Sequence, residues 1–443
     1  MRRASHWKES GPIPRGFSLW PVSPVVYGPM DILLSLLLLL LAARASGELA
    51  QRLRLPALLG EILAGVVLGP SLLGLVSPDA GITLLANLGI FFIVYLAALE
   101  LTLKDVKRSI RESGVFIAIA SFMIPLLSGV ALGRFIALPL GSSMFLGIAL
   151  AFTALPVSIG ILTDLELLET DFGRSIVSAG LLCDVAGLAM IGVVLNVSGS
   201  AGFEPLAMGI LVLRFAAFMG LLIAVDRLFR YRHGVLASWL LRASRHLVTK
   251  GATFALPFIV ALGFAFLADY LGLHFVIGAF FGTLLVAEHV VGDRDAKEVR
   301  AATAAITQGF LGPVFFAFIG LSVVVKSLAD APLVLSILAV AVLSKFIGGY
   351  VGARWSKFSL RYSVAAGIAM NGRGAMELVV AAIGLELGLI DETLFSILVL
   401  MGVVTTFLMT LGLRFTLPPD IRDRLALRTS TAKHGSGGIN GGA

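Results

Sequence analysis

The sequence predicts an all-α polytopic membrane protein with about thirteen transmembrane helices. Of its 443 residues, 58% are hydrophobic and only 14% are charged, whereas soluble globular domains contain about 25% charged residues. Apolar segments long enough to cross a bilayer recur along nearly the whole chain. They fall at about 31–46, 56–77, 82–103, 114–138, 142–163, 174–197, 204–227, 250–270, 273–290, 307–327, 331–355, 361–388 and 392–415. These observations exclude a soluble protein.

Basic residues gather in every second gap between the predicted helices. The basic gaps lie around residues 44–54, 104–111, 227–250, 294–300 and 354–361, while the other gaps hold little beyond Arg134 and Lys326. The positive-inside rule makes the basic gaps cytoplasmic. We therefore expect a multi-pass protein of the cytoplasmic membrane whose C-terminus lies inside. The net charge of +7 follows from this topology and does not indicate a nucleic-acid partner.

The same pattern divides the chain into three parts. Residues 1–29 carry Arg2, Arg3, Lys8 and Arg15 on the predicted outer side, which conflicts with the rule. They are expected to form a disordered extension, or to precede a true start at Met30. Residues 30–415 form the membrane domain, and residues 416–443 a flexible cytoplasmic tail.

Two predicted spans contain helix-breaking residues at mid-depth. The first holds Thr153-Ala154-Leu155-Pro156 and Gly160, and the second holds Gly367 and Asn371-Gly372-Arg373-Gly374. They lie seven helices apart in the predicted order, so they cross the bilayer in opposite directions. Paired interrupted helices in an inverted repeat point to the binding site of a transporter. Since Pro and Gly are common in membrane helices, ordinary packing breaks are the alternative.

Asp184 lies well inside the span 174–197, within an apolar stretch that also contains Cys183. A carboxylate at this depth is costly unless it faces water, a cation or a basic partner. Ionised, it can bind a small cation, and protonated, it carries one proton. Competition between these two ligands is the minimum requirement for exchange, although a structural Asp bonded to nearby hydroxyls remains the alternative.

Three more ionisable side chains lie at membrane depth. Lys345, in the span 331–355, must pair with an acid or give up its proton, or it stabilises the crossing of the broken helices. Arg373 and Glu377 are spaced for one helix face and form an internal pair or bind half-helix ends. His274, in an outer gap, has no assigned chemistry.

The sequence shows no signature of an enzyme. It lacks a nucleophile elbow, a glycine-rich phosphate loop and a His/Cys cluster for a metal. We therefore expect no enzymatic activity and no cofactor.

Three motifs together resemble the monovalent cation:proton antiporter-2 family of the sodium/proton exchanger superfamily. They are Leu55-Pro56-Ala57-Leu58-Leu59-Gly60 with Ala64-Gly65-Val66-Val67-Leu68-Gly69-Pro70, then Thr153-Ala154-Leu155-Pro156-Val157 with Ile161-Leu162-Thr163-Asp164-Leu165, and Met370-Asn371-Gly372-Arg373-Gly374 leading to Glu377. The resemblance spans about residues 50–415. It implies an inverted repeat with two crossed broken helices, a homodimer and an elevator movement.

The resemblance also implies roles for parts of the chain. Core helices would lie at about 114–197 and 331–415, and dimerisation or scaffold helices at about 56–103 and 273–327. Asp184 maps onto the shared cation and proton site of the family, and Lys345 onto a lysine before the second broken helix. The chain departs from the family at Cys183, where many members carry Asp or Asn, which leaves the coupling ratio open.

We therefore predict a secondary-active Na⁺ or K⁺/proton antiporter, electroneutral, that binds its monovalent cation at Asp184. Thr153, Cys183 and backbone carbonyls of the breaks complete the site, and Lys345, Asn371, Arg373 and Glu377 support it. The partners are the cation, protons, the bilayer and a second copy of the chain. A potassium efflux channel or uniporter on the same fold, a transporter-like membrane sensor and an organic-anion symporter are the alternatives.

Overall fold

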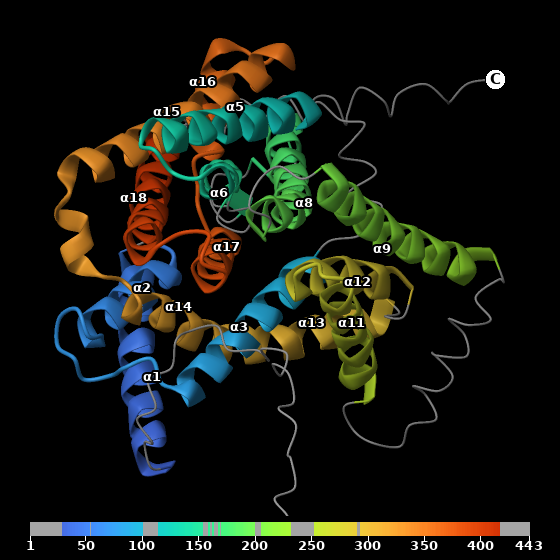
Figure 1. Ribbon diagram of the computed structural model, residues 1–443. Coiled ribbons are helices and arrows are strands. Elements are labelled where there is room, and N and C mark those ends of the chain that lie inside the picture. The colour runs from blue at the N-terminus through green and yellow to red at the C-terminus, as the bar shows by residue number, and fades with distance from the viewer. Residues whose placement is uncertain are drawn as a thin grey trace, which may run out of the picture.

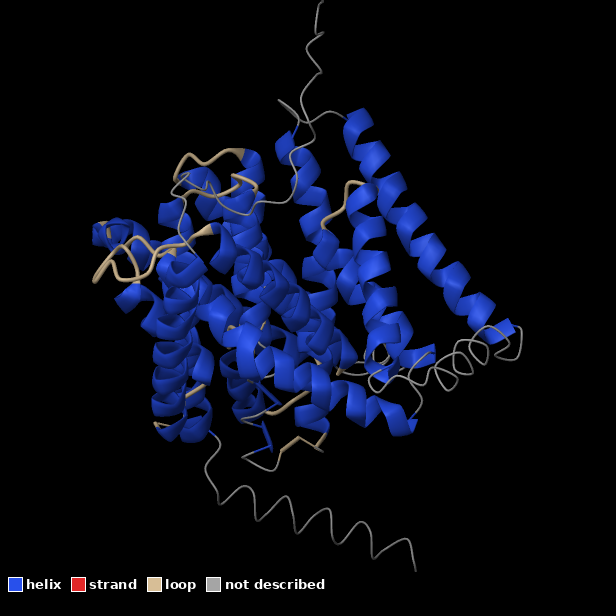
Figure 2. Cartoon of the chain, turned by 90° about the horizontal axis from the view of Figure 1, so that it is seen from below, coloured by secondary structure: helices blue, strands red, loops and turns tan. Residues whose placement is uncertain are grey.

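The chain folds into helices joined by turns and loops. The structure, a computed structural model, describes residues 29–53, 55–100, 114–153, 158–159, 162–163, 167–168, 170–199, 205–231, 252–289 and 293–416. The predicted extension at residues 1–29, apart from Pro29, and the predicted tail, apart from Thr416, lie outside the described residues. Figure 2 shows helices and loops and no strand in the part of the chain that is described, which confirms the all-α class.

The helices follow the apolar segments of the sequence. They are α1 (Pro29–Arg52), α2 (Ala57–Leu68), α3 (Ala80–Leu99), α5 (Gly114–Phe135), α6 (Leu140–Ala151), α8 (Asp171–Gly199), α9 (Pro205–Tyr231), α11 (Ala252–Tyr270), α12 (Phe275–His289), α13 (Asp293–Ile306), the π-helix η1 (Thr307–Leu311), α14 (Gly312–Leu321), the 3₁₀ helix η2 (Val325–Ala329), α15 (Ala331–Trp355), α16 (Leu360–Ala369), α17 (Ala375–Glu386) and α18 (Glu392–Thr416). Within the described residues, 7 helices are long and apolar enough to cross a membrane, and 4 shorter apolar helices accompany them. The count of thirteen spans stays a prediction.

Two predicted boundaries are wrong. The span predicted at 56–77 ends as a helix at Leu68, because Pro70 forces the preceding Gly69 into an extended conformation (φ −73°, ψ 174°). The span predicted at 307–327 begins instead at Asp293, because the polar segment before it is rich in Ala, Glu and Arg, which favour helix. The basic residues of this gap, including Arg300, therefore lie on a helix and not in a loop.

The helices pack in two groups (Figure 1). The broken-helix group consists of α5, α6, α8 and α15–α18, and the framework group consists of α1–α3 and α11–α14. Helix α9 contacts α8 of one group and α12 of the other. Direct contacts between the groups include those of α17 with α3 and of α8 with α12. The transport and dimerisation roles expected for these segments stay predictions.

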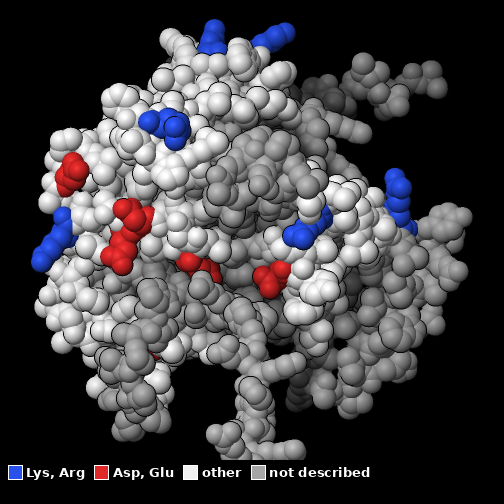
Figure 3. All heavy atoms as spheres, in the orientation of Figure 1, with Lys and Arg blue, Asp and Glu red and all other residues white. Residues whose placement is uncertain are grey.

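Exposed charged side chains are sparse on the described part of the face in view in Figure 3. Figure 3 shows that charged side chains form only scattered groups on the face in view, among the residues described there. Large apolar side chains are exposed on helices at the edge of the molecule, including Leu37 and Leu41 on α1 and Phe266 on α11. Apolar exposure on long helices is expected where lipid is the solvent.

Helix α15 approaches α5 very closely, and this contact positions the functional residues described below. A Cβ atom on Gly348 would lie 2.7 Å from the carbonyl oxygen of Ala120, and one on Gly352 would lie 2.5 Å from the Cα of Ile117. Small residues allow such backbone contact between membrane helices. Lys345 lies one turn before Gly348 and so faces the same contact.

We expect Gly352→Val to separate α15 from α5 and to destabilise the protein by about 1–3 kcal/mol, as overpacking does elsewhere. The measurement is thermal unfolding in detergent. Gly209→Val is the matched control, because a Cβ there meets no atom within 4 Å. Equal melting temperatures for the two variants would contradict the close contact.

Candidate functional site

The two interrupted helices meet at their breaks. Helix α6 ends at Ala151 and the chain is extended at Phe152, while α16 ends at Ala369 and α17 begins only at Ala375. Arg373, between α16 and α17, donates from Nη1 to the carbonyl of Ala149 on α6 across 2.7 Å. The first broken segment continues beyond Thr153, but Pro156 and Gly160 lie outside the described residues. The predicted crossing of two broken helices is therefore present.

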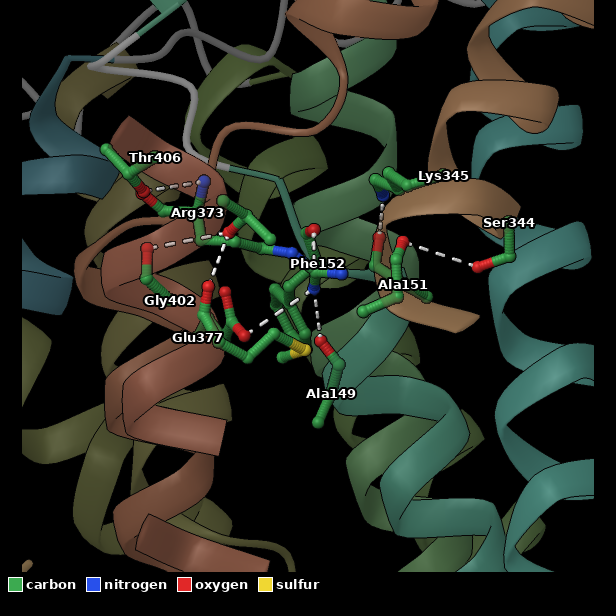
Figure 4. A network of polar contacts seen from close by, with 12 residues as sticks. Ala149, Ala151, Phe152, Ser344, Lys345, Arg373, Glu377, Gly402 and Thr406 are labelled. Atoms are coloured by element: carbon green, nitrogen blue, oxygen red, sulfur yellow. Dashed lines mark hydrogen bonds and ion pairs between the residues drawn. The ribbon is translucent and has the colours of Figure 1, made fainter. Parts of the chain in front are cut away.

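Two buried cations cover the carbonyl end of α6. The last carbonyls of a helix have no partner within the helix, and together they carry partial negative charge. Lys345 donates from Nζ to the carbonyls of Ala151 and, across 3.1 Å, of Ser121 on α5. Arg373 Nη1 also lies 3.4 Å from the carbonyl of Phe152. Figure 4 shows both cations directed at this helix end.

Neutral donors cover the end of α16. Asn371 donates from Nδ2 to the carbonyl of Gly367 across 3.2 Å and to that of Val342 across 3.1 Å. The hydroxyl of Ser158, beyond the first break, lies 3.4 Å from the carbonyl of Ala369. The two breaks thus differ: the carbonyl end of α6 receives buried positive charge, and that of α16 receives an amide and a hydroxyl.

Glu377 and Thr406 hold Arg373 in place. Glu377 lies in the first turn of α17, where the helix dipole favours a negative charge, and its Oε1 is 3.6 Å from Arg373 Nη1. Thr406 on α18 accepts the backbone N–H of Arg373 across 3.2 Å and donates to its carbonyl across 2.7 Å. The predicted pairing of Arg373 with Glu377 is therefore present in the structure (Figure 4).

Asp184 is a buried acid that, unlike Glu377, forms no ion pair with an arginine among the described residues. Its side chain is 6% exposed on α8, and its Oδ1 has no hydrogen-bond partner. The hydroxyl of Thr153, at the first break, is likewise buried and lies beside the thiol of Cys183. Asp184 and Lys345 lie close enough to interact electrostatically, but the ammonium hydrogen bonds go to backbone carbonyls. An oxygen ligand is thus left available near Lys345 and the carbonyl end of α6.

Cys183 lies beside this acid and faces α5. Its thiol donates to the carbonyl of Ala118 across 3.7 Å, and it interacts electrostatically with Lys345 and Asp184. The structure therefore brings together Thr153, Cys183, Asp184, Lys345, Asn371, Arg373 and Glu377 around the crossing of the breaks. Glu61, another buried acid, lies on α2 in the framework group.

Three residues of this network are not among those that the sequence predicts for the site. They are Ser121, whose carbonyl accepts from Lys345, Ser158 and Thr406. Their only local signal is a hydroxyl inside an apolar helix, which in most membrane helices bonds the preceding turn. No cluster of three or more His, Cys, Asp and Glu side chains occurs among the described residues. The arrangement can bind and release a proton or a small cation.

Known proteins are similar to this chain along most of its length. The family described as "Sodium/hydrogen exchanger, transmembrane" matches residues 35–418. A Na⁺/H⁺ antiporter of Enterococcus hirae is 29% identical over 87% of this chain and 98% of its own length. The Na⁺/H⁺-K⁺ antiporter GerN of Bacillus cereus is 27% identical over 86% of this chain and 94% of its own.

A solved structure shares the fold. The sodium proton antiporter MjNhaP1 of Methanocaldococcus jannaschii superposes with a TM-score of 0.62 at 18% identity, covering 89% of this chain and 98% of that one. At this identity the match establishes the architecture alone. It agrees with the predicted antiporter fold.

We expect Lys345→Met to lower the stability of the fold. Methionine has a similar length but no donor, so the buried carbonyls of Ser121 and Ala151 would lose a partner, at about 1–3 kcal/mol. Thermal unfolding in detergent measures this loss. Lys326→Met is the matched control, because Lys326 is exposed on η2. An unchanged melting temperature together with lost activity would show that Lys345 serves transport and not the helix end.

Proposed function

Because the chain belongs to the transmembrane sodium/hydrogen exchanger family, we propose that it exchanges a monovalent cation for protons, with Asp184 as the shared site. Its relatives are named for Na⁺ and K⁺ exchange, and we propose one of these two ions as the cargo. Transport is secondary-active, with no resident metal or cofactor. The protein is a carrier and carries out no enzymatic reaction.

One observation supports this proposal above the others: Asp184 presents a buried, unpartnered carboxylate oxygen while the neighbouring cations are bonded elsewhere. An ammonium or guanidinium paired with Asp184 would compete directly with a cargo ion. Here Lys345 and Arg373 instead stabilise the carbonyl end of α6, so the acid can alternate between its two ligands. Buried ionisable groups in membrane helices commonly mark such an ion path.

Oxygen atoms supply the proposed cation site. Asp184 Oδ1 is buried without a hydrogen-bond partner and the Thr153 hydroxyl is buried at the first break, and hard cations prefer oxygen ligands. Carbonyls of the first break complete the shell. We assign Cys183 to shaping the site and not to ligation, because a thiol is a soft ligand and this one donates to Ala118.

The charge carried per cycle follows from this ligand set. With Cys183 in place of a second acid, one carboxylate meets either one cation or one proton. If Lys345 keeps the same protonation state throughout the cycle, no net charge crosses the membrane. We therefore propose electroneutral exchange.

The proposed movement is an elevator displacement of the broken-helix group against the framework group. The carbonyl ends and their cations belong to one group, so the site moves as a unit. Helix α9, which contacts both groups, and η2, which leads from α14 into α15, connect them. The framework group forms the interface of a homodimer in the cytoplasmic membrane, with the C-terminus in the cytoplasm.

We expect Asp184→Asn to fold normally and to lose cation-dependent proton movement, because the amide fills the same space but cannot ionise. A pH-sensitive dye in proteoliposomes, with sodium, potassium, lithium and rubidium offered in turn, measures the loss. Asp171→Asn is the matched control, since Asp171 is an exposed acid in the first turn of the same helix. Wild-type rates in Asp184→Asn would place the site elsewhere. Cation flux without proton counterflow in the wild type would support the channel alternative.

The coupling ratio is tested by imposing membrane potentials of different size across the same vesicles with potassium and valinomycin, using sodium as the exchanged ion. Electroneutral exchange predicts an equilibrium that does not move with the potential. A shift of the equilibrium would mean that a second group, with Lys345 as the first candidate, releases a proton in each cycle. Cys183→Asp then shows whether a second acid changes the ratio.

A further inference from the structure

A histidine and a glutamate connect the two helix groups away from the Asp184 site. His274 directly precedes α12 of the framework group, and Glu386 is the last residue of α17 in the broken-helix group. Their side chains approach to 4.0 Å between Nε2 and Oε2, and they are only 10% and 19% exposed. By the distribution of basic loops, both residues lie toward the outer side of the membrane.

The bonding of the imidazole directs its proton toward Glu386. Nδ1 of His274 accepts from the backbone N–H of Val276 across 3.4 Å, so in the neutral ring the hydrogen is carried by Nε2, the atom facing the carboxylate. Oε2 of Glu386 is buried and has no hydrogen-bond partner in the present geometry. The pair is thus one short movement away from a direct bond.

A second proton on the imidazole strengthens this contact. The ring becomes a cation opposite a carboxylate, and bonds between ionised groups are about twice as strong as neutral ones. The bond from Val276 is lost in this step, but at 3.4 Å it is long and correspondingly weak. Histidine is the side chain whose charge ordinarily changes between about pH 5 and 8.

Other ionisable groups lie at the same end of the neighbouring helices. Helix α11 carries Asp269 and Tyr270 at its end, α9 carries Arg214, α3 follows Asp79, and α18 follows Asp391 and begins with Glu392. Asp79 and Asp391 accept the N–H groups of Ile82 and Leu394 as helix caps. Arg214 approaches the backbone at Gly272. Glu386 is the carboxylate that meets His274 within 4.0 Å.

We propose that His274 and Glu386 form a proton-sensitive latch that holds α17 of the broken-helix group against the start of α12 of the framework group. Acid on the outer side charges His274 and closes the latch, and alkaline conditions weaken it. A displacement that separates the end of α17 from the start of α12 breaks this contact. The effect on transport rests on the proposed function: closure of the latch slows exchange in external acid by about three-fold. This is the size of effect that one partly exposed ion pair produces.

The test uses hydrogen–deuterium exchange of the whole protein in detergent at about pH 5.5 and about pH 8. Exchange rates of the last turn of α17 and the first turn of α12 are corrected for the intrinsic effect of pH. We expect about three-fold slower corrected exchange in acid for the wild type. His274→Gln, Glu386→Gln and the double variant should all lose this difference to the same extent.

Glu392→Gln is the matched control, because it removes an exposed carboxylate at the same end of the adjacent helix α18. It should retain the difference between the two pH values. Retention of the difference in His274→Gln, or its loss in Glu392→Gln, would overturn the latch. If either single variant unfolds, the wild type and the other single variant decide the question.

A transport measurement separates the latch from the proposed function. The single variants should keep a larger share of their maximal exchange rate in acid than the wild type does. A latch seen by hydrogen exchange in a protein that moves no cations would contradict the proposed function alone. Normal antiport without any difference in hydrogen exchange would contradict the latch alone.

Discussion

The structure depends on the free carbonyl groups at the end of α6. In a membrane interior these groups cannot turn to water, and each unpartnered one costs several kcal/mol. Lys345 reaches them from α15 and Arg373 from the break between α16 and α17, and both cations are buried as a result. The broken helix is stable only with these donors, and the donors are tolerated at this depth only because the helix end faces them.

The close packing of helices and the polar network support each other. Lys345 can reach both α5 and α6 because Gly348 and Gly352 allow α15 to lie against the α5 backbone. Arg373 can reach α6 because Thr406 bonds its backbone on both sides and Glu377 lies beside its guanidinium. Asp184 is thereby left with an unpartnered oxygen next to the breaks. The proposed exchange depends on this oxygen.

The two helix groups differ in what holds them together. The broken-helix group has a buried network of charged and polar bonds around the crossing. The framework group combines close backbone contacts, such as that of Gly65 on α2 with Ala317 on α14, with separate hydrogen bonds such as that of Arg300 to the carbonyl of Leu99. Contacts between the groups involve few elements, and His274 with Glu386 is a charged pair among them.

The sequence by itself determined the features that depend on local composition. Hydropathy predicted the all-α membrane class and the course of most helices, Gly and Pro indicated both breaks, and the depth of Asp184 made it the candidate acid. Only the tertiary structure decided the partners: Lys345 bonds carbonyls of α5 and α6 and not the nearby acid, Ser158 and Thr406 join the network, and His274 meets Glu386. The physical reason is that the local sequence shows which polar groups lie in apolar segments and are costly to bury. The partner of each group lies on a distant segment that only packing brings close.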